Sequence, residues 1–433
     1  MAISKKAKGK KKKRNKSEFQ LNQPVEELVR HLLKTYDRMC KEMCQQMCPT
    51  IRNSLKEAIE NEQLVTRFII SPAPPPRLKS SQILPGIPPP CPPSPVRLWT
   101  FISALETSRY QYVKDIHIWD LSLDVVVVAD LAILIEKNFF KYLRLLEFMA
   151  CDLDFRSVQR IGECLKRTKV THLILDYNKF SDKGVNLLCN ALVSNKKLLH
   201  LSMCSCHITA TSSKALGDLI ATTAINELYL NSNSLGCDGF FNIIEKLSLQ
   251  AAEDEAKRII IKEHKEQELI LKMQNDEMEK NIVVATGQNM EKESIANVVR
   301  PKSKKKKTKK SKNSAPALPL PIGPFLTKLH VADNNIDLYT QFVDKHNPVF
   351  ISQILAQLIC GAEKTIEIDL EGNQIGEIAA SNILQALITR NEENLPKMKL
   401  NVTYRLTSDV FLQILKLSGT VQKKKAYKKS KKK

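Results

Sequence analysis

Apolar residues recur at a nearly constant interval over much of this 433-residue chain. In the stretch VTHLILDYNKF, which begins at residue 170, the recurring frame consists of Val170, Leu173, Leu175, Asn178 and Phe180. The same frame begins at residues 113, 143, 198 and 225, so successive starts lie 30, 27, 28 and 27 residues apart. It returns at residues 326 and 365, and in a weaker form at 395. Such a period predicts one solenoid of stacked units.

Each unit joins two hydrophobic periodicities. The segment HLILD at residues 172–176 alternates apolar and polar positions, which is typical of a half-buried β-strand. Val185, Leu188 and Leu192 then follow at helical spacing. Because neither element covers its own apolar face, neighbouring units must stack on one another. The sequence therefore predicts an α/β fold built from strand–helix units.

This frame resembles the leucine-rich repeat, and the period of about 28 residues with a full helix per unit resembles its ribonuclease-inhibitor type. The resemblance covers roughly residues 113–254 and 325–417. It implies a horseshoe with parallel β-strands on the concave face and α-helices on the convex face. In that family the frame asparagine bonds backbone groups of adjacent turns, which buried backbone requires. The structural repeat positions carried over are Leu173, Leu175, Asn178, Leu228, Leu230, Asn233, Asn334 and Asn373.

The asparagine is missing from four units, where Leu121, Cys151, Cys206 and Thr403 take its place. A cysteine forms such bonds only weakly, and a leucine forms none. We therefore expect the unit that begins at residue 113 to be an atypical end cap.

The segments outside the repeats differ in composition. Residues 1–17 read as a disordered basic tail, 18–70 as a helical segment, and 71–98 as a linker that contains eleven of the twenty prolines. The horseshoe occupies 99–250 and 325–420, separated by a charged helical insertion with Lys-rich and Pro-rich parts at 251–324. Residues 421–433 form a second basic tail. The insertion helix is expected to be exposed, but its apolar residues keep no strict heptad and only weakly indicate a coiled coil. A solvated helix and a partner-binding helix both fit it.

Charge is concentrated in three lysine tracts. The formal net charge is +21, and residues 5–16, 302–312 and 423–433 carry nine, eight and eight basic residues and no acidic one. The rest of the chain is close to neutral. Such tracts stay solvated and attract an acidic partner, such as tubulin tails, nucleic acid or another anionic surface. Tyr427 is the one aromatic residue within them, which gives little support for stacking on bases.

The sequence contains no pattern of a secreted, membrane or disulfide-rich protein. The first residues lack a signal peptide, and the longest apolar run, 125–135, is short and interrupted by Asp130. The eleven cysteines include no CxxC pair. Cys40, Cys44 and Cys48 are expected on one face of a helix, as an apolar stripe rather than a metal or redox site. We expect an intracellular protein with no transmembrane segment.

Catalytic and nucleotide-binding motifs are absent from the sequence: it has no GxxxxGK[ST], GxSxG, HExxH or Rossmann glycine pattern. His172 and His200 occupy the same position in consecutive units, so a shared metal or proton near Asp176 is conceivable, but no third ligand is evident. We therefore predict no enzyme, no cofactor and no small-molecule substrate.

The concave face is the predicted partner-binding surface, because residues between the inner leucines point away from the core. Trp119, Leu145, Met149 and Ile174 form an apolar patch there, unless the N-terminal helices or the Pro-rich segment cover it. The seventh frame presents three acidic residues. The full predicted set is Trp119, Leu145, Glu147, Met149, His172, Ile174, Asp176, His200, Tyr229, Asn231, Glu367, Asp369 and Glu371.

These features predict a non-enzymatic scaffold or adaptor that binds a protein on the concave face, with the lysine tracts adding electrostatic avidity. Horseshoes with long charged insertions occur in structural components of cilia and axonemes, which makes the cytoplasm and the cilium the expected location. The alternative is a nuclear or nucleolar RNA-associated protein that binds phosphates through its lysine tracts.

Overall fold

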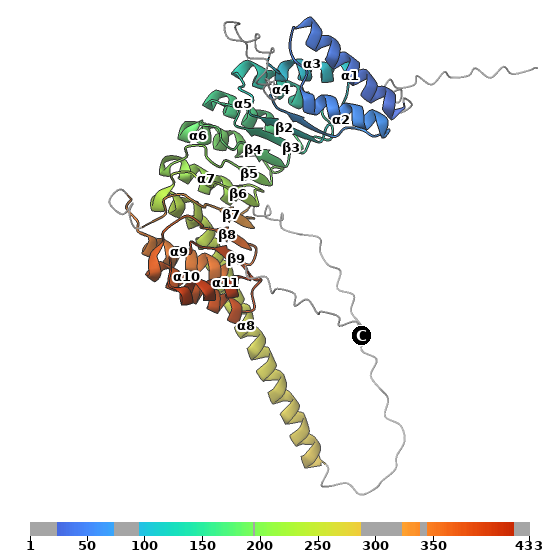
Figure 1. Cartoon of the computed structure of the whole chain (residues 1–433). Helices are drawn as coiled ribbons and strands as arrows, with labels where there is room; N and C mark the ends of the chain where they lie inside the picture. Colours follow the sequence, from blue (N-terminus) through green and yellow to red (C-terminus); the bar gives the residue numbers. More distant parts are fainter. Residues whose placement is uncertain (1–23, 73–94, 194, 287–322, 338–343, 420–433) are drawn as a thin grey trace, which may run out of the picture.

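The computed structural model describes residues 24–72, 95–193, 195–286, 323–337 and 344–419, without the side chains of 279–286. Figure 1 shows an arc in which the strands form the inner layer and the helices the outer layer. Within the described residues, one sheet contains nine parallel strands in the order in which they occur along the chain. The predicted α/β leucine-rich repeat horseshoe is thereby confirmed.

The strands are short and occupy equivalent positions in successive units. They are β1 Arg67–Ile70, β2 Asp115–Trp119, β3 Leu145–Met149, β4 His172–Ile174, β5 His200–Ser202, β6 Glu227–Tyr229, β7 Lys328–His330, β8 Glu367–Asp369 and β9 Lys399–Asn401.

The helices follow the strands on the convex side. They are α1 Val25–Glu42, α2 Pro49–Glu60, α3 Leu98–Ser108, α4 Val125–Glu136, α5 Phe155–Leu165, α6 Ser181–Leu192, α7 Ala210–Thr222, α8 Gly236–Thr286, α9 Pro348–Gly361, α10 Gly376–Glu392 and α11 Ser408–Ser418.

The frame leucines stack into a continuous core column. Leu173 pairs in register with Leu201, which pairs with Leu228, and Leu228 pairs with Leu329 on the far side of the insertion. All four side chains are fully buried. The sheet therefore continues from β6 to β7 although about a hundred residues separate the two strands in sequence.

The N-terminal end differs from the expectation. Residues 67–70, assigned to a helical segment from the sequence, form strand β1, which pairs with β2. The unit that begins at residue 113 is thus not the end of the sheet. Phe68 and Ile70 are buried, and the Phe68 ring packs against Phe101 at 5.0 Å between centroids. Helices α1, α2 and α3 together with β1 form the cap. A run as short as RFII does not distinguish strand from helix by periodicity, which explains the error.

The three N-terminal cysteines do not share a helix. Helix α1 ends at Glu42, Cys44 lies in the connection, and Cys48 immediately precedes α2. Pro49 opens α2 and disfavours helical backbone at the residue before it, so the helix predicted through this stretch is broken. Cys40 and Cys48 are buried as small apolar residues, whereas Cys44 is exposed.

Helix α8 has no break at residue 251, where the sequence suggested that the insertion begins. Its first turns belong to the convex layer between α7 and α9, and the same helix then projects beyond the body (Figure 1). Arg258 fixes the point of departure by donating hydrogen bonds to the carbonyls of Gly361 and Cys360 at 2.8 and 3.2 Å. All side chains from residue 259 to 278 are exposed. The insertion therefore leaves from the helical side of the horseshoe.

Other sequence-based assignments fall outside the described residues. The two basic tails, most of the Pro-rich linker and the central lysine tract are among them. Among the helices that the structure describes, none combines the length and the apolar character needed to cross a bilayer.

Candidate protein-interaction surface

A row of buried asparagines runs along the edge where the strands end; we call it the buried asparagine row. In the pattern that Asn178 shares with Asn233 and Asn373, Asn178 Oδ1 accepts hydrogen bonds from the backbone N–H groups of Cys151 and Leu153 at 2.9 and 3.1 Å. Its Nδ2 donates to the carbonyls of Phe148 and Leu175 at 2.8 and 2.9 Å. The side chain thus joins two units and satisfies backbone groups that strand pairing leaves free. The members of the row are Asn178, Asn233, Asn334 and Asn373.

Cysteines replace part of this bonding where the asparagine is missing. Cys151 Sγ donates to the carbonyl of Ile118 at 3.2 Å, and Cys206 Sγ donates to that of Leu175 at 3.2 Å. Each cysteine supplies only a donor, whereas its own backbone N–H is bonded by the asparagine of the next unit. Cysteine and asparagine units therefore complement each other along the first part of the sheet.

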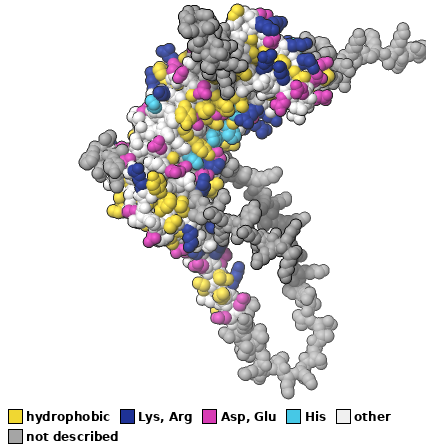
Figure 2. Space-filling model, in the orientation of Figure 1, with side chains coloured by type: hydrophobic (Ala, Val, Ile, Leu, Met, Phe, Trp, Pro, Cys, Tyr) yellow, Lys and Arg dark blue, Asp and Glu magenta, His cyan; other side chains and the backbone are white. Residues whose placement is uncertain are grey.

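The apolar patch, defined as Trp119, Leu145, Met149 and Ile174, lies on the concave face of β2, β3 and β4. All four side chains are half-buried, so the described N-terminal helices leave each of them partly accessible. Trp119 pairs in register with Met149 on the adjacent strand. Figure 2 shows hydrophobic surface next to a group of histidines at this level of the arc. Partly accessible large apolar residues that lie side by side are typical of interfaces.

A row of aromatic rings continues from the patch along the centre of the face. His172 stacks on His200 with ring centroids 5.4 Å apart, His200 lies 4.8 Å from Tyr229, and Tyr229 lies 4.4 Å from His330. Burial and the neighbouring His200 lower the pKa of His172. Within the described residues no group of three His, Cys, Asp or Glu side chains is placed to hold a metal ion. The two equivalent histidines thus lie in contact as stacked rings.

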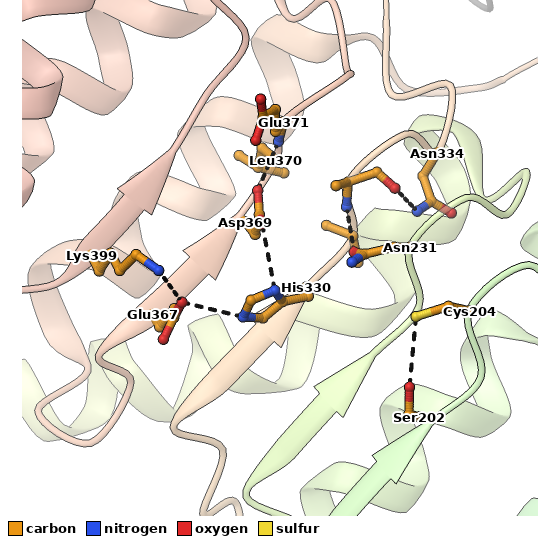
Figure 3. Close-up of polar contacts among 12 residues, drawn as sticks. Ser202, Cys204, Asn231, His330, Asn334, Glu367, Asp369, Leu370, Glu371 and Lys399 are labelled. Atoms are coloured by element: carbon orange, nitrogen blue, oxygen red, sulfur yellow. Dashed lines mark hydrogen bonds and ion pairs between the residues drawn. The ribbon is translucent and has the colours of Figure 1, made fainter. Parts of the chain in front are cut away.

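Carboxylates beside this ring row are paired with cations or imidazoles. Glu227 accepts from His200 Nδ1 at 2.9 Å and pairs with Lys328 Nζ at 2.8 Å. Burial alone would raise the pKa of Glu227, but these two partners lower it. In Figure 3, Lys399 Nζ lies 2.6 Å from Glu367, whose carboxylate is 3.4 Å from His330.

Asp369 completes this group. Its carboxylate lies 3.5 Å from His330 Nδ1 and accepts the backbone N–H of Glu371 at 3.0 Å (Figure 3). Burial acts to raise the pKa of Asp369, but the hydrogen bonds from these groups lower it overall. Glu371 itself is exposed. Two of the three acids predicted on this strand are thus engaged within the protein.

At the N-terminal end of the face, Glu147 is held by residues that sequence analysis did not single out for binding. It is bonded to His117 Nδ1, and His117 Nε2 accepts from Arg67 Nε at 3.0 Å. Burial would raise the pKa of Glu147, but the hydrogen bond and charge of His117, with the nearby Arg67, lower it. His117 is 5% exposed and therefore contributes support rather than surface. Arg67 comes from β1, the strand missed from sequence, so this contact had no sequence signal.

Comparison with known proteins gives partial likenesses only. No protein-family model matches the chain. "NACHT, LRR and PYD domains-containing protein 4B" of Mus musculus is 28% identical over 130 residues, which cover 29% of this chain and 15% of that protein. Protein 5 of the same description from Bos taurus is 32% identical over 108 residues, 24% of this chain and 10% of that protein.

A third relative, "NACHT, LRR and PYD domains-containing protein 13" of Homo sapiens, is 34% identical over 100 residues, 22% of this chain and 10% of its own length. The chain thus spans 15% or less of the length of these curated relatives. Matches of this length correspond to about four repeat units at a period near 28 residues. They support a leucine-rich repeat region and, with it, a role in protein interaction.

Proposed function

We propose that the protein is a non-enzymatic scaffold or adaptor that binds a segment of another protein on the concave face of its horseshoe. The observation that carries this proposal is the apolar patch, whose four large side chains stay partly accessible on three adjacent strands. Covering them removes apolar surface from water at about 25 cal/mol per Å². A partner that lies across these strands gains that energy.

The rigidity of the sheet adds to this surface. The patch residues alternate with fully buried residues such as Leu146, Phe148 and Leu173, and Asn178 bonds the ends of β3 and β4 together. A surface whose side chains are already ordered loses little conformational entropy on binding. The concave face is therefore suited to a partner that meets it in one orientation.

The more specific parts of the proposal concern type, partner and place. We propose a horseshoe of the ribonuclease-inhibitor type in which the lysine tracts add avidity for an acidic partner. Acidic tubulin tails would fit a ciliary or axonemal location, whereas nucleic acid would fit the nucleus or nucleolus. The lysine composition supports an acidic partner in either case. Imaging of the tagged full-length chain in ciliated cells distinguishes them: decoration of cilia is expected, and staining confined to nucleoli contradicts the ciliary version.

The concave face is tested with the double variant Trp119→Ala and Met149→Ala. We expect proximity labelling in cells to recover the main partners at least about tenfold less well, because two central apolar contacts are lost. The matched control is Val126→Ala with Ile378→Ala, two residues that are 68% and 66% exposed on helices of the convex side. The control should keep its partners.

Stability decides how a loss is interpreted. The double variant should retain the circular dichroism spectrum of the wild type and lose little thermal stability, since both side chains are only half-buried. Equal loss of partners in the convex-side control would show that the concave face has no special role. Unchanged partner recovery in a folded double variant would contradict the proposed function.

A further inference from the structure

Asp176 occupies the concave position two residues before the buried Asn178. Its Oδ1 accepts hydrogen bonds from Ser202 Oγ at 2.7 Å and from the Cys204 backbone N–H at 2.8 Å. The carboxylate thus connects β4 to the end of β5. The side chain is half-buried, and burial raises its pKa despite these two donors. A charged group is therefore kept at a place where its environment disfavours charge.

The backbone contact alone does not require a charge. Asn231 occupies the corresponding position after β6, and its Oδ1 accepts the Ala332 backbone N–H at 2.9 Å (Figure 3). A neutral amide therefore makes the same bond to the next strand. The negative charge of Asp176 is not needed for this hydrogen bond, so the free-energy cost of burying that charge needs a separate explanation.

The lysine and arginine side chains of the face are engaged elsewhere. Arg67 bonds to His117, while Lys328 and Lys399 pair with Glu227 and Glu367. Within the residues that the structure describes, no lysine or arginine lies within ion-pair distance of Asp176. The nearby Glu147 acts to raise the Asp176 pKa, and the nearby His200 acts to lower it. Among the described residues, Asp176 is therefore a half-buried carboxylate of this face that forms no ion pair with a lysine or arginine.

The apolar patch lies beside this carboxylate. Met149 is on the adjacent strand at the same level, Trp119 follows on the next strand, and Ile174 precedes Asp176 on its own strand. When a charged side chain pairs with an opposite charge and the surrounding apolar side chains exclude water, the pair is frequently a centre of binding energy in a protein interface. An arginine satisfies both features, because its stem packs on apolar side chains and its planar guanidinium stacks on an indole.

We propose that Asp176 is the anchor for a cationic side chain, arginine in preference to lysine, carried by the protein segment that binds the concave face. The residues next to that arginine in the partner are aliphatic or aromatic and cover Met149, Ile174 and Trp119. This inference rests on the proposed function and specifies the partner that the site selects.

The test begins with selection of random 12-residue peptides displayed on phage against the folded full-length chain. Peptides that bind the wild type and are lost on the Trp119→Ala, Met149→Ala variant report on the concave face. We expect these to contain arginine or lysine next to an apolar residue. The strongest one is then synthesised, together with a version in which that cation is replaced by glutamine.

Asp176→Asn keeps the acceptor oxygen and removes the charge, as Asn231 shows is compatible with the fold. We expect it to weaken binding of the synthetic peptide at least tenfold, and to weaken the glutamine version less than twofold, so that the two changes are coupled. The matched control Glu245→Gln removes an exposed charge from helix α8 on the convex side and should alter affinity less than twofold.

Each outcome has a distinct meaning. Selected peptides without basic residues, or full affinity of the Asp176→Asn variant for a peptide that still requires Trp119 and Met149, would overturn the anchor and leave the proposed function standing. If selection yields no peptide that depends on Trp119 and Met149, the proposed function fails and the anchor fails with it. An equal loss in Glu245→Gln would show a general effect of charge and would also overturn the anchor.

Discussion

The edge of the sheet that holds the buried asparagine row, here called the rim, and the concave face carry polar side chains two residues apart. The side chains of the rim and those of the face have different bonding partners. Asn178 on the rim is fully buried and bonds five backbone groups of two units through its two amide atoms. Asp176 on the face is half-buried and bonds one hydroxyl and one backbone N–H. At the rim position, four of the eight units have asparagine and two have cysteine, whereas along the face the residue type passes through Trp119, Met149, Asp176, Cys204 and Asn231.

The difference follows from what each position must satisfy. A rim side chain faces backbone donors and acceptors whose positions are fixed by the fold, so an amide is required or is partly replaced by a thiol, as at Cys206. A face side chain is partly open to water, so most polar or apolar residues are compatible with folding. The face is therefore free to be shaped by a partner, and the rim is not.

The largest effect that separates the two regions is expected from Asn178→Ala compared with Asn231→Ala. The first change orphans the buried N–H groups of Cys151 and Leu153, each of which costs about 1–3 kcal/mol, so the loss of unfolding free energy should be at least about 2 kcal/mol. The second removes one bond, to Ala332, from a half-buried side chain and should cost about 1 kcal/mol. Urea unfolding followed by circular dichroism measures both.

Equal losses in these two variants would contradict the distinction between rim and face. Hydrogen exchange provides the local check, because the Cys151 and Leu153 amides should lose protection in Asn178→Ala and keep it in Asn231→Ala. Protection that is unchanged in both variants would show that other groups satisfy this part of the rim.

The rim and the core were accessible to sequence analysis because their residues repeat. Leu173, Leu175 and Asn178 recur at a fixed spacing, and the stacking of units alone dictates their chemistry. Alternation along each strand also placed Trp119 and Asp176 on the concave face. These inferences need only periodicity, which a single sequence shows.

The pairing of charges and the N-terminal cap were not accessible in that way. Strand β1 carries no full frame, so the contact of Arg67 with His117 had no signal. Pairs such as Lys328 with Glu227 depend on cross-strand neighbours that lie about a hundred residues apart in sequence. The sequence does not show where the repeat helix ends within α8, because the repeat helix and the insertion helix follow each other without a helix-breaking residue.

Within the face, Glu227 and Asp176 should respond to pH in opposite directions. Glu227 has a lowered pKa in the folded protein because Lys328 and His200 outweigh its burial. Its contribution to stability is therefore present above the unfolded pKa of about 4.3 and is lost as pH falls through the folded pKa. Glu227→Gln should therefore lose up to about 1 kcal/mol of unfolding free energy at pH 7. At about pH 3, below the unfolded value, the difference from the wild type should shrink.

Urea unfolding at the two pH values measures this loss, with Glu371→Gln as the control, because Glu371 is exposed and forms no ion pair among the described residues. The control should match the wild type at both pH values. A loss in Glu227→Gln that is as large at pH 3 as at pH 7 would show that shape rather than charge explains it.

The smallest effect is expected from the stability of Asp176→Asn, and its sign matters more than its size. The folded-state pKa of Asp176 is raised by burial, so ionisation favours the unfolded chain and stability falls as pH rises from the unfolded pKa through the folded one. The amide keeps an acceptor for Ser202 and Cys204 without that cost. Asp176→Asn should therefore be more stable than the wild type at pH 7, by about 0.5 kcal/mol, and equal to it at about pH 3. A less stable variant at pH 7 would mean that the Asp176 charge itself stabilises the connection between β4 and β5. That result would contradict the inference that this charge is available to a partner.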